Sequence, residues 1–292
     1  MFRNLRLYRL DDWPDAETAV SDALATAGFE PCGPLTERSS GFVPVYPEAS
    51  DAFARRLGGA DLMRLRSQSR VLPAAAVNEA LESRLAEYRE RRGDEPGPRE
   101  KRRLKAETRD ALLQQALLKS DHIAGFVDLK ENVLAIDSAG EPNAERFIRR
   151  LRAALGDVGL RPLGFDRPVD ELLAKVFLGG APRQFALGRE CRMQDAKDPA
   201  ATVRWNEFDL SDRSIRRHVT DGMRLTQVAI EYDHVMSFVL DGKGVMTKVR
   251  LLGSESSDDD DPLARFDAEF ALLSGTFRNL LADMKRLLGG YG

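Results

Sequence analysis

The sequence predicts an α+β fold in which β-hairpins are flanked by helices. Residues 5–10 alternate charged and apolar side chains, which is the two-residue period of a half-buried strand. Residues 123–128 and 133–137 are two strand-like runs joined by the turn residues 130–132, and this is the pattern of a hairpin. Residues 142–155 then carry apolar side chains at helical spacing, so a helix is expected directly after that hairpin.

A helix and two further strands are expected between residue 10 and residue 70. Residues 12–15 supply a helix start, the helix continues through residues 16–27, and Gly28 ends it. Residues 41–45 and 62–69 are strand-like in composition.

A pair of charged helices is expected next. Pro73 begins the first of them, and its apolar side chains recur at helical spacing: Val77, Leu81, Leu85 and Tyr88. Residues 93–98 contain two prolines and two glycines, which break the helix. A second helix is predicted from about residue 100 to residue 118.

The second half of the chain repeats this order of elements. We expect a helix that is capped by Ser211 and reaches residue 219, strands at 225–231, 235–240 and 245–252, and a last helix at 263–288. Helix, hairpin and helix thus occur twice without sequence identity. This leaves open an architectural repeat or two unrelated α+β units. Residues 156–208 give only a helix signal at 172–178 and a strand signal at 185–187.

Three segments are predicted from these elements, and their parts need not be contiguous. They are an N-terminal α+β segment at 1–75, a basic helical pair with a hairpin and a helix at 76–160, and a C-terminal α+β segment at 161–292.

Composition narrows the class of protein. The 292 residues are 42% hydrophobic and 31% charged, with a formal net charge of −3. Cys32 and Cys191 share no metal-ligand spacing, and no apolar run approaches the ~18 residues of a membrane span. We therefore expect a cytoplasmic protein without a membrane partner. If it binds a polyanion, it must concentrate its cations on one surface.

Catalytic signatures are not found in the sequence. Its three histidines, His122, His218 and His234, occur in no HExxH or related pattern, and no cofactor or metal is expected. Residues 179–182 lack the lysine of a phosphate-binding loop, and Gly242-Lys243-Gly244 fits a hairpin turn better than a phosphate cradle.

The acidic run Asp258–Asp261 is the strongest local anomaly. Its four carboxylates could hold a divalent cation, as metal-dependent nucleases require. Consecutive residues cannot all converge on one ion, so a solvated loop is the favoured interpretation.

Three groups of basic residues suggest contacts with phosphates. Residues 84–109 hold ten Lys or Arg and six Asp or Glu. On the predicted helix Lys101 and Lys105 share one face, with Arg102 and Arg109 close by. The other groups are Arg146, Arg149, Arg150 and Arg152, and Arg213, Arg216 and Arg217. Ordinary solvated helix faces are the alternative. No motif that reads DNA bases is visible, so any DNA contact should be independent of the base sequence.

Several stretches resemble, in order and spacing, the recombination-associated RdgC family of bacterial DNA-binding proteins. They are residues 2–10, 41–44, 100–107 (EKRRLKAE), 209–211, 235–252 and 265–275. The resemblance implies a horseshoe-like subunit that closes as a homodimer into a ring around double-stranded DNA, without sequence preference. It also implies nucleoid association and functional antagonism with RecA.

The resemblance assigns roles to individual residues. Arg84, Lys101 and Lys105 match basic positions of the family, and Arg3 replaces a lysine. With their neighbours on the helix, the expected DNA-binding residues are Arg3, Arg84, Lys101, Arg102, Lys105 and Arg109. The expected dimer contact is Leu117, Lys119 and Ser120.

The chain departs from the family pattern in three places. Residues 114–117 replace a Pro-Arg-Ala-aromatic run, Ser120 replaces an aromatic residue, and residues 206–208 replace a basic-plus-amide pair. Two other functions remain open, a metal-dependent DNA-processing enzyme that uses the acidic loop and a protein–protein adaptor without DNA affinity.

Overall fold

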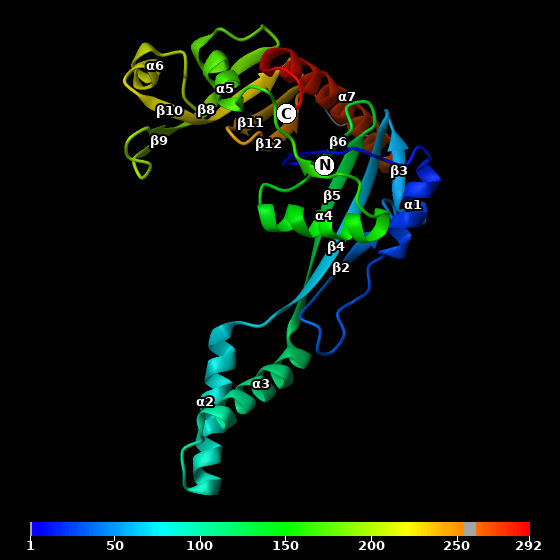
Figure 1. Cartoon of the computed structure of the whole chain (residues 1–292), viewed down its shortest axis with the longest axis vertical. Coiled ribbons are helices and arrows are strands. Elements are labelled where there is room, and N and C mark those ends of the chain that lie inside the picture. The colour runs from blue at the N-terminus through cyan, green and yellow to red at the C-terminus, as the bar shows by residue number, and fades with distance from the viewer. Residues whose placement is uncertain (1, 254–260) are drawn as a thin grey trace.

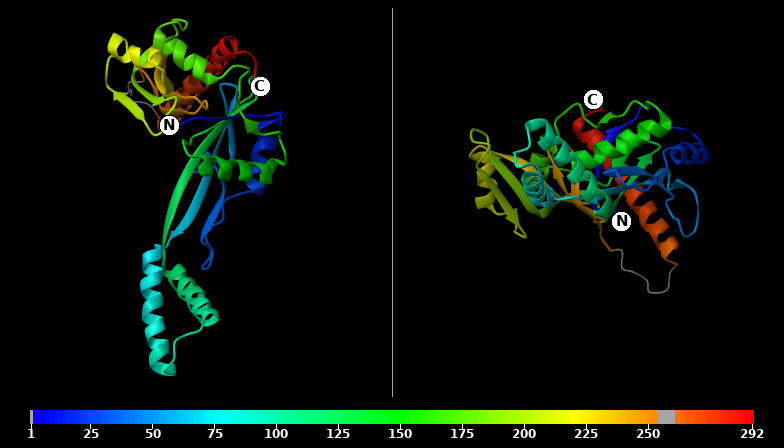
Figure 2. Two further views of the ribbon diagram at one scale, coloured as in Figure 1. Left: turned by 60° about the vertical axis from the view of Figure 1, so that its left-hand side comes forward. Right: turned by 90° about the horizontal axis from the view of Figure 1, so that it is seen from below.

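The chain folds into a crescent built on two antiparallel sheets. The computed structural model describes residues 2–253 and 261–292, and within these ranges it contains seven helices and twelve strands. The predicted α+β class is therefore confirmed. One lobe forms around each sheet, and a helical arm projects from the first lobe (Figures 1 and 2).

The first lobe is a seven-stranded sheet covered on one face by two helices. Its strands are β1 (Arg6–Arg9), β2 (Arg38–Val43), β3 (Ala54–Leu57), β4 (Ala60–Val71), β5 (Leu117–Asp128), β6 (Val133–Ile136) and β7 (Arg161–Pro162). Their order is β2-β4-β5-β6-β1-β7, with β3 paired to β4. Met63 and Leu65 of β4 pack in one core with α1 (Glu17–Thr26) and α4 (Glu141–Leu155), whereas Leu62 packs in the other core.

The arm is inserted between β4 and β5. It consists of α2 (Ala74–Arg92) and α3 (Pro98–Gln115), which pack against each other. Gly93 ends α2 in the left-handed conformation, and Pro98 begins α3, as the glycines and prolines of this turn predict. The long, paired strands β4 and β5 connect the arm to the first lobe, and the arm lies below that lobe in Figure 1.

The second lobe contains the five-stranded sheet. Its strands are β8 (Phe185–Asp195), β9 (Thr202–Asn206), β10 (Met223–Tyr232), β11 (Met236–Asp241) and β12 (Met246–Leu251), in the order β12-β11-β10-β8-β9. α5 (Val169–Leu178) and α7 (Pro262–Leu288) pack on its buried face, and α6 (Arg213–Thr220) lies at its outer end (Figure 1).

α7 joins the two lobes, because its side chains belong to a core that includes residues of both sheets. The Phe126 ring of β5 packs edge-on against Phe270 and Phe277 of α7, with ring centroids 5.5 and 5.2 Å apart. A second link is the backbone bridge between Leu5 and Met246, which exchange two N–H···O bonds of 2.8 and 3.0 Å. The wide apolar stripe of the last helix is therefore intramolecular core.

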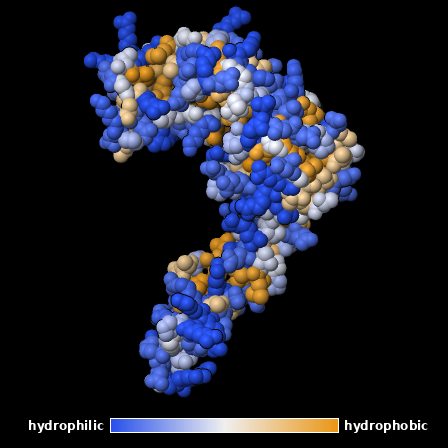
Figure 3. All heavy atoms as spheres, in the orientation of Figure 1, coloured by the Kyte–Doolittle hydropathy of each residue, from blue (hydrophilic) through white to orange (hydrophobic). Residues whose placement is uncertain are grey.

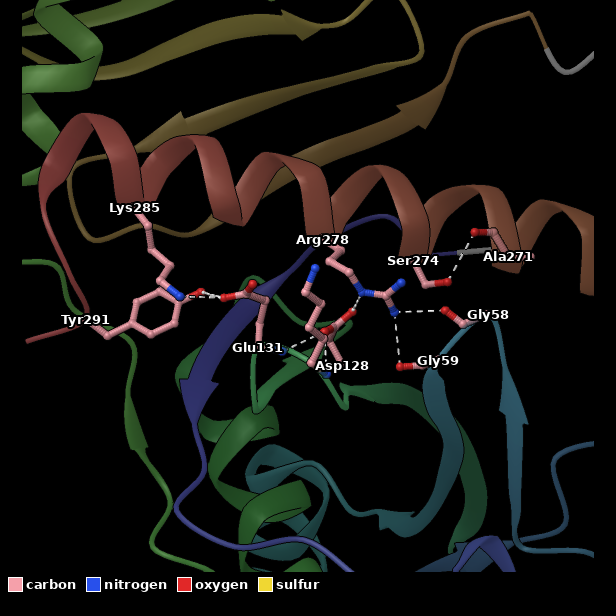
Figure 4. Close-up of polar contacts among 10 residues, drawn as sticks. Gly58, Gly59, Asp128, Glu131, Ala271, Ser274, Arg278, Lys285 and Tyr291 are labelled. Atoms are coloured by element: carbon pink, nitrogen blue, oxygen red, sulfur yellow. Dashed lines mark hydrogen bonds and ion pairs between the residues drawn. The ribbon is translucent and has the colours of Figure 1, made fainter. Parts of the chain in front are cut away.

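Ion pairs between α7 and buried carboxylates orient the helix on the first sheet (Figure 4). Arg278 Nε donates to the fully buried carboxylate of Asp128 at 2.8 Å, and Arg278 Nη2 donates to the carbonyls of Gly58 and Gly59. Closer to the C-terminus, Glu131 accepts from Lys285 Nζ and from the Tyr291 hydroxyl, both at 2.9 Å.

The pKa of Glu131 shows that these partners outweigh burial. Burial alone would raise its pKa, but the hydrogen bonds from Lys285 and Tyr291 lower it below the usual value. The carboxylate is thus held in its charged form at the junction of the lobes.

Several predicted boundaries differ from the structure. The helix expected to reach residue 118 ends at Gln115, because Leu117 and Leu118 pair with Val71 and Arg70 as the start of β5. The cap of α6 is Asp212 rather than Ser211, since its carboxylate accepts the N–H of Ser214 at 2.7 Å. Strands β3, β7 and β9 were not predicted, and all three are short.

We predict that Arg278→Ala lowers the free energy of unfolding by about 3–5 kcal/mol, because it leaves the Asp128 carboxylate buried without its cation. Urea unfolding followed by circular dichroism measures this. Arg265→Ala is the matched control, since Arg265 is an exposed arginine of the same helix. Equal destabilisation by the two variants would contradict the proposed importance of the pair.

Candidate nucleic-acid interface

The arm carries exposed basic side chains without an ionic partner among the described residues, and three of them are predicted DNA-binding residues. Among the described residues, no ion pair includes Lys101, Arg102 or Lys105 of α3, whereas Arg103 pairs with two glutamates of the same helix. Arg84 lies half-buried on α2. Of the six predicted DNA-binding residues, these four are therefore brought together on the arm, and three of them are free to meet a phosphate.

The other two predicted residues lie elsewhere. Arg109 pairs with Glu37 at 2.5 Å and so ties the base of the arm to the loop before β2. Arg3 lies at the junction of the lobes, where its N–H donates to the Asp137 carboxylate and its carbonyl accepts the N–H of Val249. The six residues thus form no single site within this subunit.

The predicted dimer contact lies where the arm joins the first lobe. Leu117 is 79% exposed and pairs with Val71, which is 47% exposed, so these two lie on one face of the strands, and Leu118, also 47% exposed, lies on the other. Apolar surface is visible where the arm joins the first lobe (Figure 3). Ser120 Oγ accepts hydrogen bonds of 3.4 Å from two side chains of β4, and Lys119 pairs with Asp121 on its own strand.

β4 carries a row of arginines that was not predicted from the sequence. Arg64, Arg66 and Arg70 lie on one face of the strand, because residues an even number apart point the same way. The Arg66 guanidinium stacks over the Phe29 ring at 4.5 Å. Opposite it in β5, burial and the charges of Arg64 and Arg66 lower the pKa of His122, so this ring is neutral at neutral pH. The spacing of the arginines along a predicted strand was the signal that could have revealed the row.

Arg70 has a structural role within this row. Its Nη1 donates to the carbonyls of Leu113, Gln114 and Ala116 at 3.0–3.4 Å, and its Nη2 donates to Gly33 O at 3.0 Å. These carbonyls lie at the end of α3, where Leu113 O also accepts the N–H of Ala116 at 3.2 Å, and a cation at a helix C-terminus stabilises such carbonyls. Arg70 therefore fixes the end of the arm to the sheet.

The opposite face of the same strands carries further cations. Arg38 and Lys119 flank Ser69 across the adjacent strands β2, β4 and β5. Arg146 of α4 donates to Ser67 Oγ at 3.3 Å, and burial together with the Arg38 charge lowers its pKa. These cations continue from the base of the arm toward α4.

The second predicted basic group divides between structural and exposed positions. Arg150 turns inward and donates to Ala27 O at 3.2 Å, and Arg152 donates to Leu160 O at 3.1 Å. Arg149 is exposed and belongs to no ion pair of the described residues. The third predicted group lies on α6 at the outer end of the second lobe, where Arg217 pairs with Asp221 at 3.3 Å.

The histidines lie on separate elements. His122 belongs to β5, the ring of His218 packs against Trp205 at 5.0 Å, and exposed His234 bonds Glu231 at 2.7 Å. Within residues 2–253 and 261–292, no three His, Cys, Asp or Glu side chains are placed to hold a metal ion. Burial raises the pKa of the Cys191 thiol to about 12.

Most of the acidic run falls outside the described residues. Asp258, Asp259 and Asp260 are not described, and the Asp261 carboxylate accepts the N–H of Leu263 at 3.0 Å as the cap of α7. In the part of the chain that the structure covers, no helix is long and apolar enough to cross a membrane.

Comparison with known proteins agrees with the resemblance seen in the sequence. The family model described as "Putative exonuclease, RdgC" matches residues 1–291. The chain belongs to the RdgC family. It is 32% identical over 286 residues to the recombination-associated protein RdgC of Xylella fastidiosa (strain M23), covering 96% of this chain and 94% of that protein.

Two further RdgC relatives match over similar lengths. The recombination-associated protein RdgC of Stenotrophomonas maltophilia (strain R551-3) is 30% identical over 289 residues, covering 96% and 95% of the two chains. That of Xanthomonas axonopodis pv. citri (strain 306) is 31% identical over 294 residues, covering 98% and 97%. The likeness to the RdgC family therefore extends through both lobes and the arm.

We predict that Arg70→Ala loosens the end of the arm, because it removes a charged donor from three helix-end carbonyls at about 1.5–3 kcal/mol in total. Hydrogen exchange should become faster in residues 113–118 and stay unchanged in α4. Arg102→Ala, an exposed substitution on the same helix, is the control. Unaltered protection of residues 113–118 would show that Arg70 does not hold the arm.

Proposed function

We propose that this RdgC-family chain binds the phosphate backbone of double-stranded DNA without reading its sequence. The observation that carries the proposal is the arm, where Lys101, Arg102 and Lys105 are exposed and unpaired among the described residues, in a chain of net charge −3. Each contact between such a cation and a phosphate releases condensed counterions, so affinity arises without base contacts.

The proposal includes a homodimer that encloses the DNA. A crescent with a basic arm can close only against a second subunit, and the exposed apolar side chains of Val71, Leu117 and Leu118 at the base of the arm offer surface for that contact. Enclosure retains DNA even when each phosphate contact is weak. Such a ring, bound along the nucleoid, would obstruct recombinase filaments, and functional antagonism with RecA follows from that occupancy.

Exonuclease activity is the second candidate, because the matching family model carries that word in its description. It would need carboxylates that converge on a divalent cation, for which Asp258–Asp260 are the candidates from sequence. End-labelled duplexes incubated with magnesium separate the two functions. Nucleotide release that disappears on deletion of residues 256–261 would establish the enzyme, whereas a salt-dependent shift without release supports the binder.

We predict that Lys101→Glu combined with Lys105→Glu weakens binding to random 40-base-pair duplexes and lowers the slope of log affinity against log salt by about two. Fluorescence anisotropy at several salt concentrations measures both. Lys175→Glu combined with Arg265→Glu changes the charge equally outside the arm and should leave the slope nearly unchanged. Wild-type slope and affinity in the folded arm variant would refute the assignment.

We predict that Ser120→Phe tightens the dimer, since a buried aromatic ring adds about 1.5–3 kcal/mol of apolar contact. The dissociation constant from sedimentation velocity should fall, and loading onto closed circular DNA should slow more than loading onto linear ends. Ser50→Phe, at an exposed position in the loop between β2 and β3 and outside the predicted contact, is the control. A wild-type monomer at micromolar concentration would contradict the ring. Equal loading rates of wild type and Ser120→Phe on closed circles would show that the ring does not open at the Ser120 contact to admit DNA.

A further inference from the structure

A cleft with apolar walls lies where the two lobes meet. It has a volume of about 470 Å³ and lies between α4 and the second lobe (Figure 1). β1, α4 and the residues around β7 line it from the first lobe, and the β11–β12 turn lines it from the second. Clefts of about 300–1,000 Å³ at the junction of two structural units are common sites for small molecules.

Six apolar side chains form the walls of this cleft. Five come from the first lobe and one from the second: Leu7, Ile148, Leu160, Pro162, Leu163 and Val245. Pro162 is exposed and Leu163 is half-buried, so a ligand in the cleft can gain apolar contact. Duplex DNA keeps the faces of its bases stacked inside the helix, so it has no apolar group to place against these walls.

Two cations reach the cleft from different lobes. Arg149 of α4 and Lys243 of the β11–β12 turn are both exposed, and neither belongs to an ion pair of the described residues. The Asp241 carboxylate accepts the N–H groups of Lys243 and Val245, both at 2.9 Å, and so fixes the backbone of that turn. One small volume therefore receives a positive charge from each lobe.

The other charged groups of the cleft also favour an anion. Arg6 and Arg152 each donate from Nη2 to a backbone carbonyl, at 2.9 and 3.1 Å, which holds these two guanidinium groups in the wall. Glu141 and Glu145 are the carboxylates of the cleft, and both are exposed on α4. Four cations thus line the cleft against two carboxylates.

The Tyr8 hydroxyl adds a neutral hydrogen-bond donor. Tyr8 lines the cleft from β1. Burial raises its pKa, and the charge of Glu141 acts in the same direction against the opposing charge of Arg6. The hydroxyl therefore keeps its proton at neutral pH and can donate to a carboxylate or phosphate oxygen.

We propose that this cleft, the lobe cleft, binds a small organic anion with an apolar body. The walls would hold the body, while Arg149 and Lys243 would bind the anionic group from the two lobes. Such a ligand touches both lobes, so its binding stabilises their arrangement in the crescent. Nucleoside monophosphates, whose base faces are apolar, and medium-chain fatty acids share this chemistry. The inference does not depend on the proposed DNA binding.

The test uses the full chain without DNA and the fluorescent dye 1-anilinonaphthalene-8-sulfonate, an organic anion with an aromatic body. Dye emission should rise and saturate. Arg149→Ala combined with Lys243→Ala should weaken the affinity by about tenfold for each cation, because a hydrogen bond to a charged group contributes that much. Lys175→Ala combined with Arg265→Ala removes the same charge outside the cleft and is the matched control.

A second variant tests the cleft itself rather than its charge. Pro162→Trp adds an indole ring at an exposed position of the wall and keeps every charge, so it should abolish dye binding. Circular dichroism and melting temperature establish that each variant is folded. Dye binding with wild-type affinity in a folded form of either variant would overturn the lobe cleft.

Two competitors distinguish the natural ligand types. Adenosine monophosphate and decanoate are each titrated at millimolar concentration against the dye bound to the wild-type chain. Displacement by either one supports the proposal and identifies the type of anion that the cleft accepts. If neither displaces the dye, the cleft binds an adventitious additive only, and the proposal is refuted.

Discussion

The geometry of this subunit depends on the attachment of α7 to both sheets. Phe126, Phe270 and Phe277 bury apolar surface on the side of the first sheet, and the same helix packs against the second. Apolar contact alone would permit the helix to slide or rotate. The buried bond from Arg278 to Asp128 fixes its register, since any shift would leave a charge buried without a partner. The curvature of the crescent is thus set by one oriented helix.

The arm is attached by a different interaction. Few apolar side chains reach from α2 and α3 into the first lobe, and the connection relies on the β4–β5 pair together with Arg70. Its guanidinium joins the end of α3 to the loop at Gly33, and the Arg109–Glu37 pair lies at the same base. Because the arm is held by hydrogen bonds and an exposed ion pair, it tilts more easily than the two lobes move relative to each other.

The basic residues divide into those with structural roles and those without a partner among the described residues. Arginines that satisfy backbone carbonyls, such as Arg70 and Arg150, contribute to folding rather than to binding. Cations without an ionic partner among the described residues occur on the arm at Lys101 and Lys105 and in the β11–β12 turn at Lys243.

Sequence alone determined the features that depend on neighbouring residues. The hairpin from β5 to β6, the helix α4 with its proline start and glycine end, and the break between α2 and α3 all follow from local periodicity and turn chemistry. The candidate residues on the arm were likewise visible, because Lys101 and Lys105 are four residues apart on one helix. The order of family-like stretches also led to the correct family.

Only the tertiary structure decided which basic residues are free and which distant elements meet. Helical spacing could not distinguish Arg149 from Arg150, since the choice depends on where Ala27 and the sheet lie. Nor could it show that Lys243 faces α4, because their proximity results from the pairing of Leu5 with Met246 and the packing of α7. Contacts between residues far apart in the chain form only when the whole core is assembled, so local sequence patterns do not predict them.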